Sequence, residues 1–540
     1  MRNSVRGVAR AGTFVPLALL ALLCVPGPAN AADVTIRRGL VGNVGTLDPQ
    51  LAATFEEGTI LTDLFEGLVS LDALGRSVPG AAESWTVSPD GRVYTFTLRA
   101  DGRWSNGEAV KAADFVASFR RLFAPSTDAT EDGPLQVIKG AVLVKQGLAK
   151  PDTLGVVAVD SKTLEITLEQ PTPTFLLRLA QPAAFPVNVA SIKKLGADFG
   201  TSGKIVSNGP YRLGAIDRED GYVLLKNKGF RAADDIEADI VAYKTFADAA
   251  DCVEAFRQKN VLTCSDVPTA NLGELKAEFG PTLEIAPYMG TYFYALSTTQ
   301  KPFDDARIRQ SLSLAIDREA LAQSAWSGGM VPADTLVPRD LSAMPMPPAA
   351  PIGERQDRAR ALLAEAGFGA AKTSDKKKIK PLEVEIRVGT GAEHEKTAKL
   401  VAADWKKIGV ETRIVTETNS DHFARLRDGA AFQVARAGWI LDEADPIDIL
   451  ELLKSDNIRF NYSRYSNRDY DAIIASADTE LDPAKRQKLL GEAETIIDTD
   501  QPVIPLLGYA SLSLVSPTLK GWEPNLVNRH PSRFLRTVSP

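Results

Sequence analysis

Three carboxylates follow one another closely at the end of an apolar stretch. Asp442, Glu443 and Asp445 come just after Gly438, and Pro446 ends the segment. An ionised carboxylate accepts charge-assisted hydrogen bonds, so these residues could hold a cationic group. The alternative is that the acids only keep a surface loop soluble, which is the better interpretation for any one of them taken alone.

The elements that should position these acids alternate between strand and helix. Strands are predicted at 382–388, 410–417 and 432–439, and helices at 393–408 and 421–427. This alternation is typical of βαβ units with a parallel sheet, in which ligands bind beyond the carboxyl ends of the strands. We therefore expect an α/β fold in which the acidic segment faces a crevice.

Residues for catalysis or metal binding form no recognisable motif. The three histidines, His394, His422 and His530, are far apart in the sequence. His394-Glu395 could start a zinc-protease helix, but Ala398 stands where the second histidine is required. A nucleophile elbow, a Walker loop and a Cys-x-x-Cys motif are all missing from the sequence. We predict that the protein is not an enzyme and has no catalytic residues, no metal site and no cofactor.

The first 31 residues have the composition of a secretory signal peptide. Three arginines precede an apolar run at 14–25, and Ala29-Asn30-Ala31 has the form of a cleavage site. The run is too short to cross a membrane. Cys24 would suit a lipoprotein, but Leu22-Leu23 precede it where small residues are expected. We predict cleavage after Ala31, export to the periplasm and no stable membrane insertion.

The charge and the length exclude one class of partner and suggest several domains. The chain has 62 basic and 69 acidic side chains, a net charge of −7. Because phosphate contacts dominate affinity for nucleic acid, an acidic protein is not expected to bind it. With 540 residues, of which 44% are hydrophobic, the chain can form a large core in two or three domains.

Two cysteines remain after the predicted cleavage, Cys252 and Cys264. Residues 248–258 are predicted to form a helix and 261–267 the strand after it. In an oxidising compartment a disulfide between the two cysteines is plausible, and would contribute roughly 3 kcal/mol. The alternative is a pair of buried free thiols.

Ordered motifs then reveal a resemblance that covers essentially the whole mature chain. Each motif alone could serve core packing or a turn. Together and in this order they resemble the peptide/nickel-binding family of extracellular solute-binding proteins, which serve ABC importers. The matching segments are 46–50, 63–68, 82–85, 88–91, 94–96, 114–121, 208–213, 302–309, 314–321 and 361–367.

The resemblance implies an α/β, two-lobed periplasmic binding protein of type II. The two lobes should close about a hinge, and the first lobe should contain an extra subdomain. The chain should cross between the lobes near Gly290 and again near Pro505. The implied parts are the signal peptide (1–31), lobe one (32–77, 204–289 and 507–540), its second subdomain (78–203) and lobe two (290–506).

The segment from Arg436 to Pro446 resembles the corresponding segment of the family's oligopeptide binders. There, an aspartate at the place of Asp442 binds the α-ammonium of the peptide. The resemblance also implies that Gly438 lets the ligand backbone approach, that Gly438 to Ile440 pair with it, and that Trp439 walls a side-chain pocket. Arg436 is expected to contribute to the site or to orient the loop.

Further ligand contacts are expected from both lobes. An arginine at the place of Arg427 can meet the carboxylate of a short peptide, which the planar guanidinium suits. The alternative for Arg427 is an exposed residue at a helix end. We also include Phe55, Ser265, Tyr292 and Tyr509 among the predicted ligand-binding residues.

We accordingly predict the substrate-binding component of an ABC importer, a monomer whose partners are a small peptide and the permease subunits. Other members of the family bind nickel chelates, haem or sugars, so a non-peptide solute is one alternative. A peptide or ester hydrolase on the same fold is a second. A chaperone-like or signalling receptor that does not deliver its ligand to a permease is a third.

Overall fold

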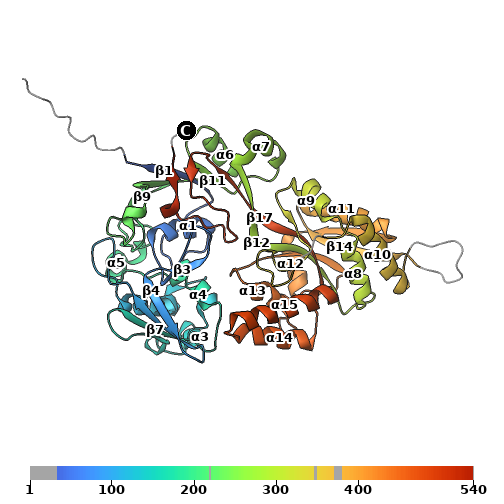
Figure 1. Ribbon diagram of the computed structural model, residues 1–540, viewed down its shortest axis with the longest axis horizontal. Coiled ribbons are helices and arrows are strands. Elements are labelled where there is room, and N and C mark those ends of the chain that lie inside the picture. The colour runs from blue at the N-terminus through green and yellow to red at the C-terminus, as the bar shows by residue number, and fades with distance from the viewer. Residues whose placement is uncertain (1–32, 218–220, 346–348, 370–379, 539–540) are drawn as a thin grey trace, which may run out of the picture. The chain divides into compact units, whose positions relative to one another are not determined.

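Two long strands, β12 (Leu283–Leu296) and β17 (Val503–Val515), pair antiparallel and join the two halves of an 11-stranded sheet. The strand order is β15 (Val410–Glu417), β14 (Leu382–Gly389), β16 (Val434–Ile440), β12, β17, β11 (Thr263–Ser265), β1 (Thr35–Val41), β10 (Ile240–Phe246), β9 (Gly221–Lys226) and β8 (Tyr211–Asp217), and β13 (Val331–Pro332) pairs with β17. In this computed structural model (Figure 1) we call the elements before β12, with the segment after β17, lobe one. The elements between β12 and β17 are lobe two.

The structure describes residues 33–217, 221–345, 349–369 and 380–538. The predicted signal peptide, Cys24 and the cleavage site after Ala31 lie outside these residues. Residues from Val34 onward form one compact unit. None of the described helices has the length and apolar content that a membrane span needs.

Lobe one contains its part of the 11-stranded sheet, which is mixed. Between β3 and β8 in the chain it also contains a smaller four-stranded sheet in the order β4-β5-β7-β6. One hydrophobic core runs through both sheets, and includes Phe65, Phe96 and Tyr211. The elements of lobe one are β1 (Thr35–Val41), α1 (Phe55–Leu64), β2 (Val69–Leu71), β3 (Ser77–Pro79), β4 (Ala82–Val87), β5 (Val93–Leu98), α2 (Ala112–Leu122), α3 (Ala141–Lys145), β6 (Val156–Ala158), β7 (Thr163–Thr167), α4 (Phe175–Arg178), α5 (Val189–Leu195), β8 (Tyr211–Asp217), β9 (Gly221–Lys226), β10 (Ile240–Phe246), α6 (Ala249–Arg257), β11 (Thr263–Ser265), α7 (Leu272–Phe279), β18 (Leu519–Lys520) and β19 (Arg536–Thr537).

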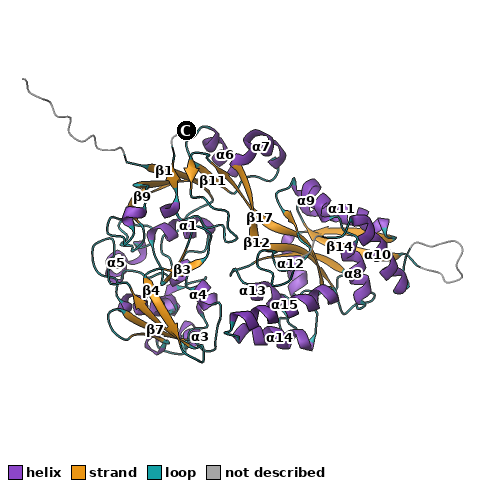
Figure 2. Ribbon diagram, viewed as in Figure 1, coloured by secondary structure: helices purple, strands orange, loops and turns teal. Residues whose placement is uncertain are grey.

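Lobe two surrounds its part of the sheet with helices (Figure 2). Its elements are α8 (Ala306–Leu314), α9 (Arg318–Trp326), β13 (Val331–Pro332), α10 (Ile352–Glu365), β14 (Leu382–Gly389), α11 (Ala392–Lys407), β15 (Val410–Glu417), α12 (Asn419–Arg427), β16 (Val434–Ile440), α13 (Pro446–Leu450), α14 (Arg468–Thr479) and α15 (Pro483–Asp500). The residue boundaries predicted for the lobes and the subdomain stay a prediction.

The predicted βαβαβ unit is confirmed. Strand β14 pairs in parallel with both β15 and β16, and helices α11 and α12 form the crossovers. Val401 and Trp405, which recur at helical spacing, are fully buried on the inner face of α11. The indole N–H of Trp405 donates to the Leu312 carbonyl at 2.9 Å and so joins α11 to α8.

The sulfurs of Cys252 and Cys264 are joined in a disulfide, with 5.9 Å between the Cα atoms. Cys252 lies on α6, and Cys264 lies in β11, next to β1 in the sheet. Both residues are fully buried within an apolar cluster of lobe one. The bond therefore ties a helix of lobe one to a strand of its sheet.

Candidate functional site

The last residues of β16 have a strand neighbour on one side only. Strand β12 pairs with β16 along its whole length, from Leu296↔Val434 to Gly290↔Ile440. On the other side β14 pairs with β16 only at Val434 and Ala435. Among the described residues, the far edge of Gly438 to Ile440 therefore has no strand partner. Such an edge presents backbone groups with which an extended chain can pair.

Asp442 lies just beyond this edge, in a loop that Asp448 orders from inside. One oxygen of Asp448 accepts the backbone N–H groups of Asp442 (2.8 Å) and Glu443 (3.1 Å). The other accepts the indole N–H of Trp439 at 2.7 Å. Sequence reasoning missed Asp448, because it stands within α13 and beyond Pro446. The carboxyl group of Asp442 is itself exposed and makes none of these bonds.

Electrostatics favour a cation at the end of β16. Partial burial raises the pKa of Asp442, and burial together with the charge of Asp442 raises the pKa of Asp448. Both shifts mean that the site penalises negative charge while no counter-ion is bound. A cationic group would relieve the repulsion between the two carboxylates.

The solvent-facing interpretation of the other two acids is wrong. Glu443 is 8% exposed, and its carboxylate lies 2.7 Å from the guanidinium of Arg178 in α4. Asp445 is also 8% exposed and binds Arg486 of α15 through both oxygens, at 2.7 Å each. These two acids therefore hold structure together, and of the three only Asp442 is exposed.

The ion pair of Glu443 and Arg178 also joins the four-stranded subdomain to lobe two. Close by, the side-chain amide of Gln181 donates to the backbone carbonyl of Asp442 at 3.0 Å. Gln170 donates to Asp478 at 3.1 Å and makes a third contact between the same two parts. The loop that carries Asp442 is thus held from lobe one as well as from lobe two.

Arg178→Ala should lower the free energy of unfolding by about 3 kcal/mol at pH 7, because it leaves Glu443 buried and unpaired. Burial already raises the pKa of Glu443, and Arg178 opposes that rise. A carboxyl whose folded-state pKa lies above its unfolded value destabilises the fold when charged, and protonation relieves this as the pH falls. Urea unfolding at pH 7 and pH 5 should therefore show a smaller loss at pH 5.

The control for this prediction is Arg76→Ala, which removes an exposed ion pair with Asp72 and should change stability little. Equal losses for Arg178→Ala at the two pH values would contradict a role for the charge of Glu443.

Arg436 lies among aromatic rings next to the open edge. Its guanidinium carbon is 5.2 Å from the ring centre of Tyr292 and 5.4 Å from that of Phe423. Its Nε is buried without a hydrogen-bond partner in the part of the chain that the structure describes. The expected direct contact of Tyr292 with a ligand needs correction, because Tyr292 is fully buried and can only support Arg436 from below.

Two histidines that are distant in sequence converge on this arginine. The imidazole of His422 is 2.7 Å from the Arg436 carbonyl, and that of His394 is 3.3 Å from the Tyr292 hydroxyl. Burial, reinforced by the charge of Arg436, lowers the pKa of His394 to about 4, so this ring is neutral at pH 7. Sequence spacing carried no sign of this convergence.

Gly438 and Gly290 face Tyr509, which follows the second crossing. A Cβ added at Gly438 would clash with the Tyr509 hydroxyl, and one at Gly290 would lie 2.6 Å from the Trp439 carbonyl. Internal packing therefore requires the glycine at Gly290, where backbone atoms stand in the way, whereas at Gly438 the Tyr509 side chain would have to shift. Tyr509 thus lies beside Gly438, whose near neighbours in the chain are Trp439 and Arg436. That these four residues bind a ligand stays a prediction.

Three predicted residues lie apart from this group. Arg427 is exposed at the end of α12, as its alternative interpretation described. Ser265 ends β11 in lobe one, opposite Ser513 of β17. Phe55 begins α1, also in lobe one. Just before it, the N–H groups of Ala53 and Thr54 already donate to Glu57, so a ligand strand could use only the carbonyls there.

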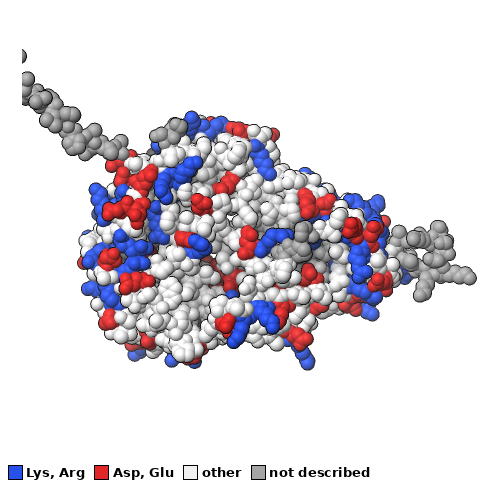
Figure 3. Space-filling model, viewed as in Figure 1, with Lys and Arg blue, Asp and Glu red and all other residues white. Residues whose placement is uncertain are grey.

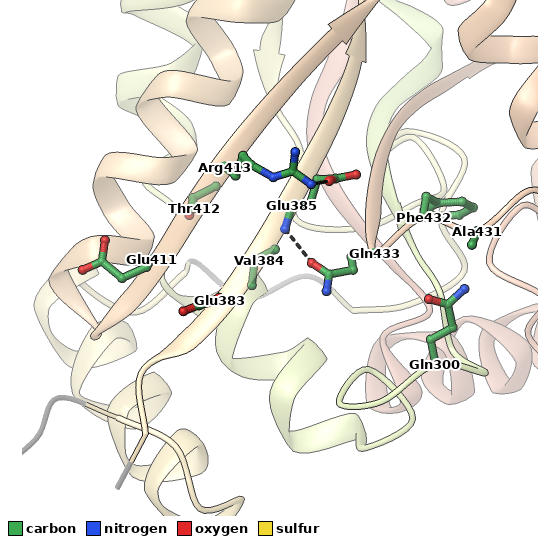
Figure 4. A pocket seen from close by; sticks show the side chains of 10 residues that line it. All are labelled: Gln300, Glu383, Val384, Glu385, Glu411, Thr412, Arg413, Ala431, Phe432 and Gln433. Atoms are coloured by element: carbon green, nitrogen blue, oxygen red, sulfur yellow. Dashed lines mark hydrogen bonds and ion pairs between the residues drawn. The ribbon is translucent and has the colours of Figure 1, made fainter.

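A pocket of about 490 Å³ lies elsewhere in lobe two, at the starts of β14 and β15 (Figure 4). Glu385 and Arg413 form an ion pair on its wall, and Gln433 accepts the Glu385 N–H at 2.6 Å. It contains none of the predicted ligand-binding residues.

Within the described ranges, no group of three or more His, Cys, Asp or Glu could hold a metal ion. On the face drawn in Figure 3, acidic and basic side chains are intermixed.

Comparison with known proteins decides the family. The profile of the bacterial extracellular solute-binding proteins, family 5 (middle), matches residues 76–461. The chain is a family 5 solute-binding protein. The resemblance seen in the sequence is confirmed, and so is the two-lobed type II periplasmic binding protein fold.

Individual relatives of this solute-binding protein match nearly the whole chain. The periplasmic oligopeptide-binding protein OppA of Escherichia coli is 32% identical, over 94% of this chain and 95% of OppA. The probable deoxycholate-binding periplasmic protein YgiS of the same organism is 31% identical, over 93% and 95%. The unliganded open form of the periplasmic murein tripeptide-binding protein MppA superposes with a TM-score of 0.87 at 30% identity, covering 94% of this chain and 98% of MppA. All three are named as binding proteins rather than as enzymes.

Proposed function

We propose that this solute-binding protein is the periplasmic substrate-binding component of an ABC importer and that it binds oligopeptides by their amino terminus. The single observation that carries the proposal is the exposed carboxylate of Asp442 beside the unpaired edge of Gly438 to Ile440. An extended peptide can pair with that edge while its α-ammonium meets the carboxylate. Backbone pairing of this kind gives affinity with little dependence on sequence.

The neighbouring residues have consistent roles in this proposal. Trp439 and the exposed Ile440 flank the first side chains of the peptide. Arg436 orients the edge of Gly438 to Ile440 and offers a positive charge to the ligand. Among the candidate residues that the structure describes, it alone has a buried guanidinium nitrogen without a hydrogen-bond partner. Phe55 lines the site from lobe one, and the role of Arg427 in meeting a carboxylate stays a prediction.

Two observations support the proposal from outside the site. Two strands, β12 and β17, connect the lobes, which suits closure about a hinge when a ligand binds. The relatives named oligopeptide-binding and murein tripeptide-binding bind peptides in a periplasm. We propose that the protein acts as a monomer and transfers the peptide to the permease.

Native mass spectrometry of the purified protein, followed by calorimetry with defined peptides, tests this function. We expect retained or added masses that match short peptides. A retained solute that is not a peptide would favour the alternative that the relative named deoxycholate-binding raises. Peptides shortened during incubation with a mixed pool would favour a hydrolase instead.

A further inference from the structure

Arg529 is a cation of lobe one without a carboxylate partner. Its Nη1 donates to the Phe55 carbonyl (2.8 Å) and to the Thr59 hydroxyl (3.2 Å) at the start of α1. The guanidinium carbon lies 4.4 Å from the ring centre of Phe55. Among the described residues, no acceptor bonds its Nε or Nη2 and no acid lies within ion-pair distance. These contacts hold the guanidinium in place and leave the edge formed by Nε and Nη2 without a hydrogen-bond acceptor.

Backbone hydrogen bonds bring the segments that carry Arg529 and Asp442 to the same residue of β12. Met289 of β12 donates to the Leu526 carbonyl at 3.2 Å and accepts the Leu441 N–H at 2.9 Å. A segment hydrogen-bonded to a strand lies about 4.8 Å from it, so the two segments are at most about 10 Å from each other. Arg529 is three residues after Leu526, and Asp442 is the residue after Leu441.

The electrostatic influences on Tyr288, the residue before Met289 in β12, agree with this placement. Burial raises the pKa of Tyr288, while Arg529 lowers it and Asp442 raises it. Burial lowers the pKa of Arg529, and the phenol of Tyr288 and the carboxylate of Glu56 oppose that shift. Glu56, in the same lobe, is thus the acid whose charge raises the pKa of Arg529, but the two residues form no ion pair. A buried guanidinium without a carboxylate partner is stabilised when the ligand brings an anionic group to it.

We propose that Arg529 binds a carboxylate on one of the first three side chains of the ligand, so that the protein prefers peptides that are acidic near their amino terminus. This inference rests on the proposed function, because it uses Asp442 as the anchor of the α-ammonium. An extended peptide rises about 3.3 Å per residue, so a separation of at most about 10 Å is covered by the first three residues. The free edge of a guanidinium suits a carboxylate, with two parallel hydrogen bonds.

Calorimetry with matched tetrapeptides tests the proposal. The set contains glutamate or glutamine at position one, two or three of an otherwise all-alanine peptide with a free amino terminus. We expect at least one glutamate peptide to bind about ten-fold or more tightly than its glutamine twin, as for a hydrogen bond to a charged group. Arg529→Gln should erase this preference, and Arg529→Lys should keep part of it because the charge remains.

The control variant is Arg536→Gln, which makes the same charge change at an exposed residue of the same C-terminal segment. It should keep the full preference. Equal binding of glutamate and glutamine twins by the unmodified protein would overturn the proposal. So would an Arg529→Gln variant that weakens both twins equally, since that is the result of a purely structural role. Failure of every peptide to bind would overturn the proposed function as well, whereas binding of the glutamine twins upholds it independently of Arg529.

Discussion

Asp442→Ala should weaken the binding of a peptide with a free amino terminus by about 2–5 kcal/mol, the usual cost of leaving a buried charge unpaired. The carboxylate lies where the parallel strand β16 ends, and closure of the lobes would surround it with low-dielectric protein. Asp442→Asn should lose nearly as much, because the amide keeps the shape of the side chain but not its charge. Isothermal titration calorimetry of the purified variants measures both losses.

The ligand provides the control for this prediction. An N-acetylated twin of the same peptide lacks the ammonium, so it should bind the unmodified protein weakly and should lose little more in Asp442→Ala. The melting temperature should hardly change, because the exposed carboxyl of Asp442 bonds no other side chain in the described structure. Equal affinity for the free and acetylated peptides would end the assignment and direct the search towards a ligand without an amino terminus.

The part of the fold around this residue could be predicted because its signals are local. Apolar residues alternate in β14 and recur at helical spacing in α11, so these elements are recognisable within their own spans. The order of strand and helix then implies a parallel sheet, and a parallel sheet implies which strand ends form the crevice. Each of these steps depends on residues close together in the sequence.

The roles of Glu443 and Asp445 could not be predicted in the same way. Their partners, Arg178 and Arg486, belong to other elements, and one of them belongs to another lobe. Nothing in the spacing of acids in a loop distinguishes an ion pair that tertiary packing will form from a side chain that will stay solvated. The convergence of His394 and His422 on Arg436 has the same origin.

The burial of Tyr292 shows a limit of strand periodicity. Strand β12 is central in the sheet, and from Gly290 to Leu296 every residue is buried, whichever face it occupies. In a strand covered on both faces, alternation carries no information about which side chains meet solvent. An aromatic residue at the crossing between the lobes therefore looked like a ligand contact, although it belongs to the core.

Asp445→Ala should destabilise the protein without acting directly on the ligand. Its two oxygens bind both terminal nitrogens of Arg486 at 2.7 Å, and one of them also accepts the Ile447 N–H at 3.0 Å to cap α13. Breaking a buried pair by removing one partner costs about 3–5 kcal/mol, because the other charge stays buried. Urea unfolding followed by circular dichroism should show the loss as a lower midpoint.

Two further variants separate this structural role from a role in binding. Asp442→Ala, three residues away, should unfold like the unmodified protein. The two variants should therefore differ in kind: Asp442→Ala lowers affinity, and Asp445→Ala lowers stability. Replacing Asp445 and Arg486 together by apolar residues should recover part of the loss, because no unpaired charge then remains. If Asp445→Ala were as stable as the unmodified protein, the loop of acids would be held mainly by Asp448 and its three hydrogen bonds.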